Sequence, residues 1–168
     1  MLALTAGEPP GFAVAIWPAA GLAMAAVLRL GPKACVPIAI GSIAANLASH
    51  SDDGTGSTAV LAGISIAIGV GAAAQAALAL FLVLRYATSP TRTGSVVAFV
   101  LLGGPVACLL SASIGIGSLL ALGIEQPATA LAAWLTWWAG DSIGVVLVAP
   151  IVLCRSSTSL RWPQRSQI

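Results

Sequence analysis

The chain has 168 residues, of which 58% are hydrophobic and only 7% are charged, and its mean hydropathy is +1.01. Soluble domains carry about 25% charged residues, so this composition excludes a soluble globular domain and indicates an integral membrane protein in contact with the lipid bilayer. The net charge of +2 is too small to indicate a nucleic-acid partner.

The N-terminal part of the chain is predicted to be a short extracytoplasmic segment, residues 1–11, followed by a membrane helix. This segment contains Glu8 and no basic residue, so it lacks the charged start of a secretory signal. The first apolar run, residues 12–30, has about the length that a helix needs to cross a bilayer. Pro18 is expected either to open the regular part of this helix or to kink it. The second run, residues 34–48, is short, and we expect Pro37 and Gly41 to interrupt it.

Three longer apolar runs follow. Residues 58–84 are nearly uncharged, residues 96–122 contain Gly103-Gly104-Pro105, which predicts a kink, and residues 129–154 form the last run. The sequence therefore predicts an all-α, polytopic membrane bundle of about five transmembrane helices in residues 12–154. Residues 155–168 are rich in Ser, Thr and Arg without periodicity and are predicted to be a disordered basic cytoplasmic tail.

Charged residues separate between the two ends of these helices. Basic residues are retained in the cytoplasm, so this separation predicts an outside N-terminus and a cytoplasmic C-terminus in a bacterial cytoplasmic (inner) membrane. The predicted inner side carries Arg29, Lys33, Arg85, Arg92, Arg155, Arg161 and Arg165, and the outer side carries Glu8, Asp52, Asp53 and Glu125.

Small residues recur at helical spacing in the predicted helices. Lipid offers little hydrophobic drive for helix association, so close approach through small side chains supplies the contact energy. These small-residue surfaces predict a tightly packed bundle and are also compatible with a homo-oligomer. The predicted helix-packing residues are Gly103, Ser111, Gly115, Gly140 and Gly144.

One acidic residue, Asp141, does not fit the separation of acidic and basic residues between the two sides of the membrane. It lies about 12 residues into the last helix, or roughly 18 Å at 1.5 Å per residue, which places it near the middle of the bilayer. A carboxylate there costs roughly 2.5–3.5 kcal/mol, so it must face the bundle or a cavity, where it is hydrogen-bonded or protonated. Two interpretations stay open: a carboxyl group that holds helices together, or a group that responds to a ligand or a proton.

Few other polar or amphipathic side chains lie in the spans. Asn46 ends a short run, and we expect it either to be a partner of Asp141 or to hold helices together. Gln75 is expected to link helices, and His50 to be a solvated loop residue. Tryptophans favour the membrane interface, but three of them lie close enough in the predicted bundle to form a pocket with Asp141 and Asn46. They are Trp17, Trp137 and Trp138.

No catalytic site is predicted. The only histidine lies in a loop away from every cysteine, and no second intramembrane carboxylate is paired with Asp141. The glycines lie within apolar helices rather than in phosphate-binding loops. Because no Cys-x-x-Cys or Cys/His pairing occurs, neither a metal nor a cofactor is predicted.

Four motifs, taken together and in this order, resemble those of a known family. The most specific is Trp137-Trp138-x-Gly-Asp141-x-x-Gly144 with Pro150 downstream. The other three are Trp17-Pro-Ala-Ala-Gly21, Gly41-Ser-Ile-Ala-Ala-Asn46-Leu and Ser111-Ala-Ser-Ile-Gly115. With these motifs the chain, from about residue 12 to residue 154, resembles the MASE1 family of bacterial integral membrane sensor domains.

The resemblance implies a non-catalytic input module fused to a cytoplasmic histidine kinase or cyclic-di-GMP enzyme. It also implies a further helix before Trp17, and further helices and an output domain after Pro150. We therefore expect a stand-alone or truncated module that senses an unknown small ligand and acts on a kinase or cyclase of another chain. The alternatives are a small proton- or ion-coupled transporter that uses Asp141 and a purely structural, oligomerising membrane fragment.

Overall fold

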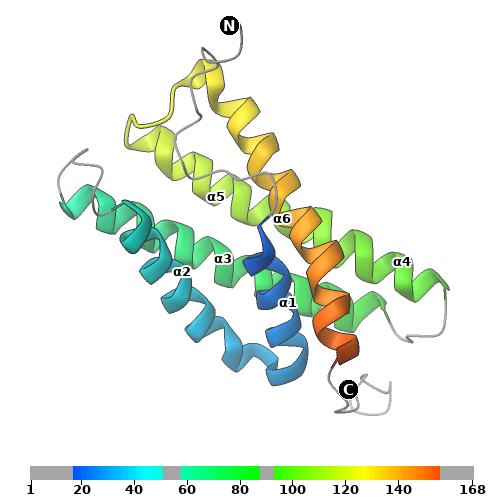
Figure 1. Ribbon diagram of the computed structural model, residues 1–168. Coiled ribbons are helices and arrows are strands. Elements are labelled where there is room, and N and C mark those ends of the chain that lie inside the picture. The colour runs from blue at the N-terminus through cyan, green and yellow to red at the C-terminus, as the bar shows by residue number, and fades with distance from the viewer. Residues whose placement is uncertain (1–16, 51–57, 88–92, 156–168) are drawn as a thin grey trace, which may run out of the picture.

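The computed structural model describes residues 17–50, 58–87 and 93–155, and all regular structure within them is helical (Figure 1). The predicted all-α class is therefore confirmed, whereas the predicted outer segment, residues 1–11, and the tail beyond Arg155 lie outside the described residues. The helices are α1 (Pro18–Leu30), α2 (Cys35–His50), α3 (Thr58–Tyr86), α4 (Thr93–Leu101), α5 (Ala107–Ala121) and α6 (Pro127–Arg155). A 3₁₀ turn, η1 (Gly31–Ala34), joins α1 to α2, and a π-helical turn, η2 (Leu102–Val106), joins α4 to α5.

Four helical stretches among the described residues are long and apolar enough to cross a membrane: Pro18–Ser49, Thr58–Tyr86, Thr93–Ala121 and Pro127–Arg155. The first contains both α1 and α2, and Figure 1 shows α2 turning back from α1 as the second arm of a V. With 13 and 16 residues, each arm is shorter than the roughly 20 residues that one span needs. The count of five crossings and their sidedness therefore stay predictions.

The break between the first two arms is at Gly31 rather than inside the second arm. Gly31 has a φ of 72°, a conformation that favours glycine, and its N–H closes the last turn of α1 on the carbonyl of Val27. The predicted interruption by Pro37 and Gly41 is wrong, because α2 runs without a break from Cys35 to His50. Pro37 is the third residue of α2, where the backbone N–H has no partner within the helix, so a proline costs little. Pro18 opens α1, the first of its two predicted roles.

The residues Gly103-Gly104-Pro105, at which a kink was predicted, lie in the π-helical turn η2 within the long helical stretch Thr93–Ala121. Proline has no N–H to donate, and a π turn is a common way to accommodate an interruption of the helical ladder. The turn also lets a neighbour approach: a Cβ on Gly103 would lie 3.2 Å from Sδ of Met24 and 3.3 Å from Cγ2 of Val83. Contact between α1, α3 and η2 therefore depends on this glycine.

Helix α3 lies at the centre of the bundle, between α2 and α5. A Cβ on Gly69 would meet Ile43 of α2, with Cγ1 at 2.5 Å, and a Cβ on Gly71 would meet Ile114 of α5, with Cγ2 at 3.3 Å. Helix α1 lies beside the C-terminal half of α6 and parallel to it. The guanidinium group of Arg29 donates to the carbonyl oxygens of Val152, at 2.5 Å, and Leu153, at 3.3 Å.

The described charged residues near the helix ends follow the predicted separation. Helices α1, α3 and α6 carry Arg29, Arg85 and Arg155 in their last turns, and these three helix ends lie at the same end of the bundle (Figure 1). Glu125 lies at the opposite end, in the connection between α5 and α6. Only Asp141 carries a formal charge in the middle of a described helix.

Candidate functional site

Asp141 lies at the midpoint of α6 and is only 3% exposed. The Ser111 hydroxyl of α5 and the indole N–H of Trp137, one turn earlier on α6, interact with the carboxylate as hydrogen-bond donors. Cys108 lies on the same side of α5 and is completely buried. The carboxylate is thus held between α5 and α6, as expected for a polar group within a membrane helix.

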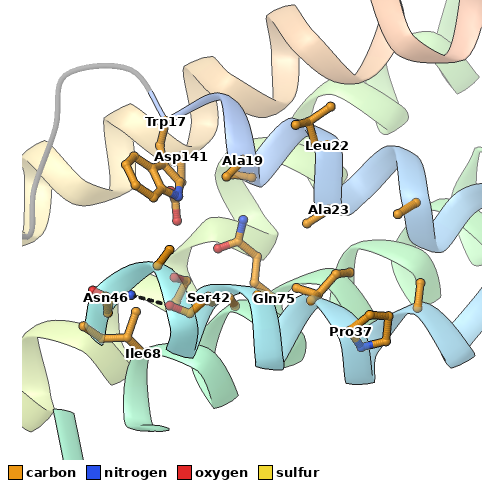
Figure 2. Close-up of a pocket in the computed structure, with 18 of the residues that line it drawn as sticks. Trp17, Ala19, Leu22, Ala23, Pro37, Ser42, Asn46, Ile68, Gln75 and Asp141 are labelled. Atoms are coloured by element: carbon orange, nitrogen blue, oxygen red, sulfur yellow. Dashed lines mark hydrogen bonds between the residues drawn. The ribbon is translucent and has the colours of Figure 1, made fainter. Parts of the chain in front are cut away.

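A cavity of about 490 Å³ opens next to this carboxylate. It lies between α1 and α2, α3 closes its inner side, and Asp141, Ser111 and Trp137 line one end. Figure 2 shows Trp17 and Asp141 together at that end, with Gln75 between the two arms. Of the five residues predicted to form a pocket, four line this one cavity: Trp17, Asn46, Trp137 and Asp141.

The start of α1 is pressed against α6 beside Asp141. The backbone N–H of Trp17 donates to the carbonyl oxygen of Gly140, at 3.1 Å. A Cβ on Gly144 would overlap the carbonyl oxygen of Trp17, and a Cβ on Gly21 would overlap the carbonyl oxygen of Gly144. Only glycines allow backbones to approach this closely. The packing role predicted for Gly144 thus corresponds to a backbone contact that places the first turn of α1 at the cavity. Gly140 takes part in this contact through its carbonyl oxygen, a group that every residue has, so its predicted packing role stays a prediction.

Gln75 of α3 has a larger part in the site than expected. Its Nε2 donates to the sulfur of Cys108 at 3.3 Å, so it does link α3 to α5. Its Oε1, however, is buried without a hydrogen-bond partner, and the side chain lines the cavity although only 5% of it is exposed. In the sequence, Gln75 is recognisable only as a single amide side chain within the long apolar run of α3. Its position in the sequence does not show that one of its two polar atoms has no hydrogen-bond partner.

Asn46 lines the cavity but is not a hydrogen-bond partner of Asp141. Its Nδ2 donates to the carbonyl oxygen of Ser42, one turn earlier on α2, at 2.9 Å (Figure 2). Its described bond therefore lies within its own helix, and neither of the two predicted roles is seen. His50 is the last residue of α2 rather than part of a loop, and its side chain lies outside the described residues.

The MASE1 family model matches residues 3–168, essentially the whole chain. The chain belongs to the MASE1 family. MASE1 domains are membrane-associated sensor domains of signalling proteins, so the family predicted from the motifs and the sensor class are confirmed. Comparison with curated proteins finds no match, and comparison with solved structures finds none either.

In this MASE1 domain the two adjacent tryptophans of the Trp-Trp-x-Gly-Asp element have different surroundings. Trp137 and Asp141 are one turn apart and face the cavity. Trp138 is rotated to the other side of α6, where its Nε1 donates to the carbonyl oxygen of Pro105 at 2.8 Å. Its ring also stacks on that of Trp134, with centroids 6.1 Å apart. The prediction that Trp138 lines the pocket is therefore wrong, because successive residues on a helix point about 100° apart.

Proposed function

We propose that this MASE1 domain is the non-catalytic input module of a histidine kinase or cyclic-di-GMP signalling system, and that its stimulus acts at Asp141. One observation carries the proposal: a carboxylate at the midpoint of a membrane helix, 3% exposed, lies at the end of a cavity of about 490 Å³. Burying such a group costs free energy, so its position beside a cavity favours a role in binding.

The contacts of α1 suggest how the stimulus reaches the output. Helix α1 contacts α6 at both of its ends, through Trp17 beside the cavity and through Arg29 at the last turn of α6. A ligand that binds between α1 and α2 therefore favours one position of α1 against α6 over another. It shifts the equilibrium only by the difference between its affinities for the two states. The C-terminal end of α6 would carry this shift to a kinase or cyclase.

Family membership favours this sensor role over the transporter alternative, although a deep carboxylate next to a cavity suits both. A transporter would accumulate protons or ions in proteoliposomes and would lose this activity in Asp141→Asn. We expect no coupled uptake from proteoliposomes that contain the full chain. Uptake that depends on Asp141 would contradict the sensor proposal.

The decisive experiment fuses the full chain to a cyclic-di-GMP-synthesising output domain and measures product formation in membranes. Asp141→Asn keeps the shape of the side chain and removes its charge, so we expect the response to stimulus to be lost at normal membrane levels. Glu125→Gln is the matched control. Glu125 is also 3% exposed, but it lies outside the cavity and accepts a hydrogen bond from Thr129 at 2.6 Å. An unchanged response in Asp141→Asn would overturn the role of this carboxylate.

A further inference from the structure

We propose that the cavity between α1 and α2 binds a cationic amphiphile, with an ammonium head at Asp141 and an apolar chain between the two arms. This inference rests on the proposed function, since it names the class of ligand that the sensor site takes. It is argued from two unfilled hydrogen-bond acceptors that line the cavity, from the lack of basic side chains among its described lining residues, and from the exposure of the end away from Trp17.

The carboxylate of Asp141 has accepting capacity that its neighbours among the described residues do not fill. An ionised carboxylate accepts about four hydrogen bonds, and two donors, Ser111 and Trp137, interact with it. The first turn of α1 supplies few further hydrogen-bond donors to this carboxylate. Pro18 has no N–H, and two other backbone N–H groups already donate to carbonyl oxygens. Trp17 donates to Gly140 at 3.1 Å, and Ala20 donates to the carbonyl of Trp17 at 3.2 Å.

A second unfilled acceptor lies in the same cavity. Oε1 of Gln75 is buried without a partner, while Nε2 of the same side chain is occupied by Cys108. Leaving a buried acceptor unpaired is costly, and such groups are usually satisfied by a ligand, water or protein. Figure 2 shows this amide between the two arms, with Asp141 beyond it at the Trp17 end. With Asp141 ionised, both open groups are acceptors, so a hydrogen-bond donor is the kind of group that completes them.

The charge of the groups that line the cavity favours a cationic donor over a neutral one. Of the described residues that line it, none is Lys, Arg or His. Arg29 of α1 is engaged instead by the carbonyl oxygens of α6. An ammonium group supplies the counter-charge and strong, charge-assisted hydrogen bonds. The indoles of Trp17 and Trp137 line the same end and favour a cation over their faces. An anionic head, including the phosphate of a phospholipid, would meet a carboxylate and no basic side chain.

The remainder of the cavity suits an apolar chain that enters from the bilayer. Its walls there are formed by Leu22, Ala26 and Leu30 of α1 and by Pro37, Ile38 and Gly41 of α2. Leu22 is 51% exposed and Leu30 is 68% exposed, so the space is open along the arms. From Ala19 to Leu30 the wall of α1 is roughly 17 Å long at 1.5 Å per residue. A volume of about 490 Å³ also lies within the range of ordinary ligand sites.

The test is a titration of the full chain in phosphatidylcholine nanodiscs with dodecylammonium, dodecanol and dodecanoate, followed by tryptophan fluorescence and thermal stability. The three probes share one chain and differ in the head. We expect saturable binding of dodecylammonium at least about tenfold tighter than that of the other two, because it alone donates charge-assisted hydrogen bonds. Dodecyltrimethylammonium has the charge but no N–H, so it should bind more weakly than dodecylammonium.

Variants locate the head and the chain separately. Asp141→Asn should weaken the binding of dodecylammonium by at least about tenfold and leave the binding of dodecanol unchanged. Gln75→Leu should weaken the binding of dodecylammonium about fivefold. Glu125→Gln is the control for a buried carboxylate outside the cavity. Gly41→Leu should block every probe, since a Cβ there meets nothing within 4 Å and a larger side chain extends into the space between the arms. Gly117→Leu is its control, because Gly117 is equally open but does not line the cavity.

Equal affinity for the three heads would overturn the proposal, as would unchanged dodecylammonium binding in both Asp141→Asn and Gly41→Leu. The two proposals fail differently. If Asp141→Asn abolishes the signalling response but dodecylammonium does not bind selectively, the sensor role stands and the ligand class is wrong. If dodecylammonium binds through Asp141 but output does not depend on this residue, the binding site stands and the proposed function falls.

Discussion

The six-membered ring of Trp137 lies directly against Gly115 of α5: a Cβ on Gly115 would be 2.8 Å from Cη2 and 3.0 Å from Cζ2 of this indole. Real Cβ atoms almost never approach another heavy atom below 3.0 Å. The absence of a side chain at Gly115 therefore sets the orientation in which Trp137 directs its N–H to Asp141. One residue predicted only to pack helices thus supports the polar end of the cavity.

Replacing Gly115 with Ala should move Trp137 and disturb the site at a distance. Overpacking of this kind typically costs about 1–3 kcal/mol, and we expect a loss of unfolding free energy in this range together with a changed tryptophan emission maximum. Gly117→Ala, two residues away on the same helix, is the matched control because its added Cβ would meet nothing within 4 Å. Equal thermal unfolding and emission for the two variants would contradict the contact.

Arg29 should stabilise the last turn of α6. The final four carbonyl groups of a helix have no partner within it, and Arg29 donates to two of them, those of Val152 and Leu153. Its positive charge also lies at the negative end of the helix dipole. We expect Arg29→Gln to speed amide hydrogen exchange at the end of α6 about fivefold, which corresponds to about 1 kcal/mol.

The control for this experiment is Arg85→Gln. Arg85 is also in the last turn of a helix, but its guanidinium lies 5.5 Å from the ring centroid of Tyr86 rather than on the carbonyls of α6. Its loss should leave exchange in α6 unchanged. If both variants speed exchange alike, a general effect of positive charge is responsible rather than the contact between α1 and α6.

Trp138 should contribute to stability and not to ligand binding. Trp138→Phe keeps an aromatic ring for stacking and removes the hydrogen bond to Pro105, so a partly buried carbonyl of the π turn loses its donor. We expect a loss of about 0.5–1.5 kcal/mol in unfolding free energy, measured by chemical denaturation, with unchanged probe binding.

Trp134→Phe is the matched variant for Trp138→Phe. The two rings stack on each other, but Nε1 of Trp134 donates to Ser113 on an exposed surface, at 3.2 Å. The exposed bond should contribute less, so Trp134→Phe should be the milder change. Weakened binding of dodecylammonium in Trp138→Phe alone would show that this side chain acts on the cavity, against the described geometry.

Several features of this protein could be predicted from its sequence because they depend on local chemistry. An apolar composition excludes a soluble fold, and the motif around Asp141 identifies the family over essentially the whole chain. Gly103-Gly104-Pro105 indicates an interruption of the regular α-helix because proline lacks an N–H wherever it occurs, and the structure has a π-helical turn there. The rule that a charged residue in a membrane helix avoids lipid likewise predicts the burial of Asp141.

Other features of the candidate site were decided only by packing between helices. The sequence shows that Gln75 carries one donor group and one acceptor group, but only the approach of Cys108 determines which of them is used. It shows two prolines in the first arms, but the chain turns at Gly31, where a positive φ reverses its direction. It places Trp17 far from Asp141 in the chain, and the glycine contact between α1 and α6 brings them to one cavity. Local rules describe what each residue tolerates, whereas distances between helices depend on how all their surfaces fit together.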